Sequence, residues 1–89
     1  MSCYIVLFEV QEASRLSALT DALKSYSSYC PVTAHAWAVI TETGAKEVRD
    51  KLLPLVGRKD QIFVIRSGTE GAWLNAYGPK HSEWLKKNL

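Results

Sequence analysis

Glu9 is the residue of this chain whose setting most strongly suggests a chemical role. It interrupts the apolar run Cys3–Val10 near its end. A carboxylate there costs desolvation energy unless it reaches water, a partner or a metal ion. Hard divalent cations accept such oxygen ligands, which makes Glu9 a candidate metal ligand and catalytic residue. The structural alternative is a hydrated acid, or one that caps the amides starting the next helix.

The thiols and imidazoles carry no comparable signal. Cys3, Cys30, His35 and His81 lack the close spacing of a zinc site. Neither cysteine belongs to a recognisable set of His or Asn partners for covalent catalysis, so we expect two free thiols. The N-terminal apolar run lacks a basic leader and a cleavage site, and it is too short to cross a bilayer. These features predict a cytoplasmic protein with no membrane partner.

The charge balance is mildly basic. The chain of 89 residues has 11 Lys and Arg against 9 Asp and Glu, a net charge of +2. This excess is too small to indicate nucleic-acid binding by itself, but the basic residues become denser from Arg58 onward. Arg58, Lys59 and Arg66 are therefore candidate contacts for nucleic-acid phosphates. The alternative is an ordinary solvated surface.

The aromatic residues do not form an RNA-recognition motif. Trp37 lies in a predicted strand, but the basic-glycine-aromatic pattern of that motif is missing. We therefore expect Trp37 in a core or an interface. The aromatic residues of the C-terminal segment are expected to fix that segment to the domain; they are Trp73, Tyr77 and Trp84.

Periodicity places these residues on a series of short elements. Apolar residues alternate or run together in the predicted strands and recur at helical spacing in the predicted helices. Ser14 is the expected N-cap of the first helix, and Pro79 suits the first position of the last helix. A single bent strand over 29–41 is an alternative to two strands. The expected elements are strand 3–10, helix 15–26, strands 29–33 and 35–41, helix 44–53, strand 61–66, short extended segment 72–77 and helix 80–88.

This order predicts a single α+β domain over residues 1–89. Two right-handed β-α-β crossovers give a ferredoxin-like β-α-β-β-α-β sandwich, with an additional C-terminal short strand and helix. Both crossover helices then cover one face of the sheet. The first and fourth strands are apolar on both faces, so the other face would expose an apolar patch. The C-terminal segment could cover part of it, and we expect a homodimer to cover the rest.

Five short segments carry a resemblance to a known family. They end the first strand, form the strand after the hairpin turn, end the second helix, form the fourth strand and lie in the last helix. In this sequence they are residues 7–10, 36–41, 48–54, 60–65 and 84–87. On these segments the chain resembles the small SinR-like hypothetical proteins of bacteria and their phages. Those proteins are distant relatives of the CRISPR-associated Cas-two family and of VapD-like toxins.

The resemblance implies two functions. In Cas-two proteins the first strand usually ends in an aspartate, which meets its copy near the dimer axis and has been linked to divalent metal and phosphodiester cleavage. The family also serves as a non-catalytic dimer that holds DNA. Glu9 stands at the matching position, with a side chain one methylene longer. We therefore expect a non-catalytic dimer that binds nucleic acid or protein, or alternatively a magnesium- or manganese-dependent endonuclease that uses Glu9.

Overall fold

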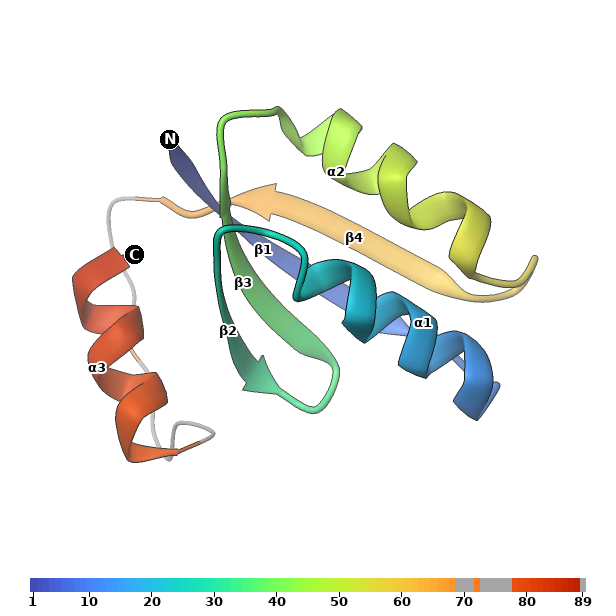
Figure 1. Cartoon of the computed structure of the whole chain (residues 1–89), viewed down its shortest axis with the longest axis horizontal. Helices are drawn as coiled ribbons and strands as arrows, with labels where there is room; N and C mark the ends of the chain where they lie inside the picture. Colours follow the sequence, from blue (N-terminus) through green and yellow to red (C-terminus); the bar gives the residue numbers. More distant parts are fainter. Residues whose placement is uncertain (69–71, 73–77, 89) are drawn as a thin grey trace.

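The strands form one antiparallel sheet in the computed structural model, which describes residues 1–68, 72 and 78–88 (Figure 1). Its strand order is β2-β3-β1-β4, and every neighbouring pair is antiparallel. The strand that ends in Glu9 is therefore a central strand, as its apolar composition requires. The bounds are β1 Ser2–Glu9, β2 Ser28–Thr33, β3 Ala36–Thr41 and β4 Gln61–Arg66.

Three α-helices are present in the described part of the chain, so the fold is α+β, as predicted. They are α1 Ala13–Leu23, α2 Ala45–Leu52 and α3 Pro79–Asn88. The second helix begins after the N-cap Gly44 and passes into the short 3-10 helix η1, Leu53–Leu55. Pro54 lies in that 3-10 turn and cannot donate the backbone hydrogen bond that would continue the α-helix.

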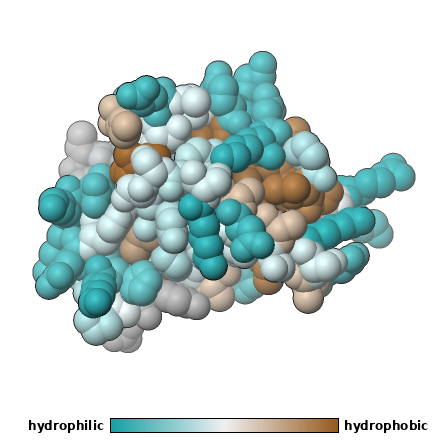
Figure 2. Space-filling view, viewed as in Figure 1, coloured by the Kyte–Doolittle hydropathy of each residue, from teal (hydrophilic) through white to brown (hydrophobic). Residues whose placement is uncertain are grey.

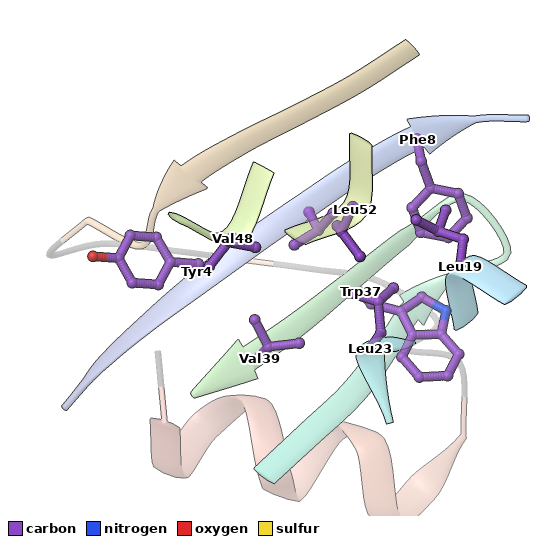
Figure 3. Packing of buried hydrophobic residues seen from close by; sticks show 9 residues of the cluster. Tyr4, Phe8, Leu19, Leu23, Trp37, Val39, Val48 and Leu52 are labelled. Atoms are coloured by element: carbon purple, nitrogen blue, oxygen red, sulfur yellow. The ribbon is translucent and has the colours of Figure 1, made fainter. Parts of the chain in front are cut away.

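The main core lies between the sheet and the helices α1 and α2 (Figure 3). Tyr4, Val6 and Phe8 alternate along β1 and turn to this side, where they meet Trp37 and Val39 of β3. The helices contribute their apolar stripes, which at helical spacing face the sheet. Those stripes are Leu19 and Leu23 of α1 and Val48 and Leu52 of α2, all fully buried.

A second, smaller core lies on the opposite face of the sheet. Leu85 of α3 packs there against Cys3, Cys30 and Ala38. Figure 1 shows α3 beside β2 and away from α1 and α2. Trp84 strengthens this contact because its indole Nε1 donates a hydrogen bond to Ser28 Oγ at 3.0 Å. The last helix therefore covers one part of the face that the other helices leave open.

The remaining part of that face is apolar and exposed. Leu7 of β1 stands opposite Phe63 of β4, and Ile5 stands opposite Ile65. Leu7, Phe63 and Ile65 are 41%, 62% and 44% exposed. We call these three residues the open-face patch. The expected apolar surface thus exists, but α3 reduces it to the β1–β4 side of the sheet.

Several predicted boundaries differ from the structure. The first helix begins at Ala13, so Ser14 is not its N-cap; Glu12 has that position, and the Ser14 hydroxyl donates to its carboxylate at 2.8 Å. The same helix ends at Leu23, three residues before the predicted end. The region 29–41 forms two strands joined by a turn, with His35 in the turn. The predicted extended segment 72–77 lies outside the described residues, apart from Ala72.

The predicted positions of two tryptophans agree with the structure. Trp37 is buried in the main core, where its ring stacks on Tyr29 with centroids 5.8 Å apart. Trp84 fixes α3 to β2, whereas Trp73 and Tyr77 lie outside the described residues. None of the helices that the structure describes is both long and apolar enough to cross a membrane.

Candidate functional site

Two of the candidate residues, Glu9 and Arg58, line an open groove of about 1010 Å³ at one end of the sheet. Its walls come from the end of β1, the β2–β3 turn, η1 and the turn before β4. Glu9, His35, Arg49 and Arg58 bring charged or polar groups to it, and Leu7, Leu53, Ile62 and Phe63 bring apolar surface. Figure 2 shows that hydrophobic atoms also reach the surface between α1 and α2, among hydrophilic side chains. This end of the molecule therefore combines charge with accessible apolar surface.

Glu9 is accessible to solvent and lies beside a histidine. Its side chain is 58% exposed, and its Oε2 is 3.9 Å from His35 Nδ1. The β2–β3 turn brings the two residues together, although 26 positions separate them in sequence. The sequence did not predict this proximity, because nothing in the local pattern fixes where the hairpin turn lies relative to the end of β1.

Glu9 alone does not make a metal centre. Within the described part of the chain, no group of three or more His, Cys, Asp or Glu side chains could hold a metal ion. Magnesium and manganese take about six ligands, mostly oxygens. One copy of the chain brings Glu9, the nitrogen of His35 and the amide of Gln61 to this place, which are too few oxygen ligands for a magnesium site. A second copy would have to contribute ligands.

The three basic candidates do not lie together. Arg58 and Lys59 are adjacent and exposed in the turn before β4, where Arg58 also lines the groove with Glu9. Arg66 ends β4, about 17 Å farther along a six-residue strand. It stands opposite Tyr4, so its side chain belongs to the sheet face that α1 and α2 cover. The structure therefore separates Arg66 from the other two.

Arg58 and Lys59 are free to meet a ligand. Among the residues that the structure describes, neither side chain makes an ion pair or a hydrogen bond. Arg49, by contrast, is bound to Asp50, with 2.9 Å between Arg49 Nη2 and Asp50 Oδ1. Within the described ranges, Arg58 and Lys59 are thus unpaired cations at this end of the sheet.

Asp60 has a structural role that the sequence did not predict. Its Oδ2 accepts a hydrogen bond from Gly57 N at 2.7 Å, and its Oδ1 accepts one from Gln11 N at 3.2 Å. The bond from Gly57, with smaller contributions from Gln11 and Arg15, lowers the pKa of this carboxyl. The sequence carried no clear signal for this role, since Asp in a turn commonly bonds a backbone amide that follows it, whereas the amide of Gly57 precedes Asp60.

The two thiols stay out of this site. Cys3 and Cys30 are both free and buried beneath α3, and burial raises the pKa of each thiol. They lie on β1 and β2, with β3 between them. Two interstrand spacings separate their backbones by about 10 Å, beyond the roughly 7 Å limit for a disulfide. Two unpaired thiols were predicted, and the structure agrees.

Comparison with known proteins identifies the fold but no family. No family model matches the chain, and no curated protein matches it. Among solved structures, the crystal structure of a hypothetical protein, TT1823 from Thermus thermophilus, is similar with a TM-score of 0.70. The two chains are 18% identical over 84% of this chain and 92% of that one. This likeness shows a shared α+β fold and leaves the function to be argued from the residues.

Proposed function

We propose that this chain forms a non-catalytic homodimer that binds the phosphate backbone of nucleic acid. The observation that carries the binding proposal is the pair Arg58 and Lys59, which is exposed, adjacent and unpaired in the described structure. Cations of this kind bind phosphates by releasing counterions. Arg49 is already paired and Arg66 lies at the far end of β4, so neither belongs to the proposed contact.

The proposed family is consistent with the arrangement of the sheet. Read from its other edge, the order β2-β3-β1-β4 is β4-β1-β3-β2, with antiparallel neighbours throughout. Such an order is what a ferredoxin-like sandwich requires, and it supports the proposed relationship to SinR-like and Cas-two proteins. The two free thiols support a reducing, cytoplasmic location for this activity.

The open-face patch is the proposed dimer contact. It consists of three exposed apolar side chains, one on β1 and two on the edge strand β4. Contiguous apolar surface of this kind is characteristic of interfaces. A second copy is the occupant we propose because β4 is an edge strand, and two copies of one edge can meet around a two-fold axis with the same residues on both sides.

The binding proposal is tested by titrating a 20-base-pair DNA duplex at several salt concentrations. We expect the affinity to fall as salt rises, and the double variant Arg58→Ala/Lys59→Ala to bind more weakly with a shallower salt dependence. Arg66→Ala is the matched control and should change neither. Absent or salt-insensitive binding would reject the nucleic-acid proposal and leave a protein partner as the remaining function of the dimer.

The second candidate function is a metal-dependent endonuclease that acts on RNA or duplex DNA. Glu9 favours it because its register partner Gln61 places it on the same sheet face as Leu7 and Phe63. A dimer formed across that face could therefore bring two Glu9 carboxylates together. Magnesium or manganese bound there would supply an activated water. This candidate requires ligands from both copies, so it depends on the dimer.

A further inference from the structure

The turn that carries the two free cations is held in place by its own acid. Asp60 N donates to Gly57 O at 3.2 Å, and Gly57 N donates back to the Asp60 carboxylate at 2.7 Å. The same carboxylate accepts from Gln11 N, in the connection between β1 and α1. We call residues 57–60, closed by these three bonds, the latched turn. The latch joins two segments that lie 49 positions apart in sequence.

Arg15 of α1 closes the latch from outside. Its guanidinium lies so near Gly57 that a Cβ at that position would collide with Arg15 Nη1. The same guanidinium is 3.8 Å from the Glu12 carboxylate and attracts the charge of Asp60. A side chain at position 57 would therefore displace the Arg15 guanidinium from the turn. Together these contacts hold the turn against the start of α1.

We propose that Asp60 is a positioning residue that holds Arg58 and Lys59 ready to contact nucleic-acid phosphates. This inference rests on the proposed function and adds to it how the cations are presented. Both cations lie between the two latched residues, Gly57 and Asp60. The latch bonds therefore restrain the backbone that carries them. Binding then costs less ordering entropy than it would on a free turn.

Charge alone predicts the opposite behaviour. Asp60 lies in the same surface hollow as Arg58 and Lys59, so removing its negative charge should strengthen the attraction of a phosphate. Loss of the latch should weaken binding instead. An asparagine keeps one acceptor oxygen but presents an NH2 group to the second backbone amide, and a donor cannot satisfy a donor. The substitution Asp60→Asn therefore separates the two effects by their sign.

The experiment compares Asp60→Asn with Glu12→Gln, at a temperature where circular dichroism shows both variants fully folded. Glu12 lies in the same hollow but makes no bond to the latched turn, so it is the charge-matched control. We expect Asp60→Asn to weaken binding of the 20-base-pair duplex about fivefold, with an unchanged salt slope because both cations remain. Glu12→Gln should bind equally or more tightly. If Asp60 only stabilises the fold, Asp60→Asn molecules that remain folded should bind the duplex with unchanged affinity, which would overturn the proposal.

The failure of this inference differs from the failure of the proposed function. If the duplex binds and Asp60→Asn binds as tightly as the unmodified chain or more tightly, positioning is wrong and nucleic-acid binding stands. If the duplex does not bind, the proposed function is wrong, and inorganic tripolyphosphate becomes the probe. Amide NMR shifts of Arg58 and Lys59 on its addition, reduced in Asp60→Asn, would then support positioning. Equal or absent shifts would overturn it.

Discussion

Leu7 of β1 and Phe63 of β4 are register partners, and both side chains are exposed on the sheet face that α1 and α2 do not cover. Glu9 lies on the same face, two residues along β1 from Leu7. The apolar pair and the carboxylate therefore belong to one surface. A partner that covers Leu7 and Phe63 would therefore also lie close to the Glu9 carboxylate. This relationship links the dimer to the choice between the two proposed functions.

The first prediction concerns self-association. Sedimentation at micromolar concentration should give twice the 10.0 kDa mass of one chain. Phe63→Ser should shift the particle toward the single-chain mass, because burying a phenylalanine contributes about 1.5–3 kcal/mol. Tyr29→Ser is the control, since Tyr29 is 39% exposed but lies on β2, at the opposite edge of the sheet from β4. A single-chain mass for the unmodified protein would contradict the dimer.

The second prediction concerns catalysis. If the endonuclease proposal is right, cleavage of RNA or duplex DNA should require magnesium or manganese and should be lost in Glu9→Gln. The isosteric amide removes the charge that would hold the metal. Phe63→Ser should also lose cleavage, because a dimer is needed to complete the ligand set. Residual cleavage that Glu9→Gln leaves untouched would point to a contaminating nuclease.

The third prediction concerns acid stability. The lowered pKa of Asp60 means that the folded state favours the charged carboxylate. Its stabilising contribution is therefore complete above the ordinary carboxyl value of 3.8 and is lost as pH falls from there through the lower folded pKa. Urea unfolding between pH 2 and pH 7 should show a steeper acid loss for the unmodified chain than for Asp60→Asn. Parallel curves would contradict this assignment.

The fourth prediction concerns the docking of α3. Leu85→Ala should destabilise the helix contact by about 2–5 kcal/mol, the usual cost of a buried leucine. Because Leu85 covers both cysteines, their reaction with a thiol reagent should become faster. Lys86→Ala changes an exposed neighbour on the same helix and should leave the rate unchanged. Equal thiol rates in Leu85→Ala would mean that other contacts keep the cysteines covered.

The sequence predicted most of the fold because its strong signals are local. The apolar run Cys3–Val10 and the apolar centre of 61–66 predicted the first and fourth strands, and helical spacing up to Leu53, just before Pro54, predicted the extent of the second helix. The predicted start of the first helix was wrong because Ser14, a residue type that often forms an N-cap, lies within the first turn instead. The helix ends at Leu23 although Tyr26 still packs against the core, and no local pattern predicts that end.

The site was less predictable because long-range contacts make it. Glu9 could be recognised from its place at a strand end. Its neighbour His35 could not, because only the folded β2–β3 turn places it beside Glu9. Asp60 bonds Gln11 across the molecule, and no local pattern encodes that distance. Arg58 and Arg66 were equally good candidates for phosphate contacts in the sequence, but the length of β4 and its register with β1 place them at different ends of the sheet.

Trp37 and Trp84 lie on opposite faces of the sheet, one stacked on Tyr29 in the main core and one bonded to Ser28 beneath the last helix. Each indole therefore reports on a different layer by its fluorescence. With Trp73 and one of these two replaced by phenylalanine, the remaining emission would record either the melting of the main body or the release of the C-terminal helix. The order in which the layers come apart is thus open to optical measurement.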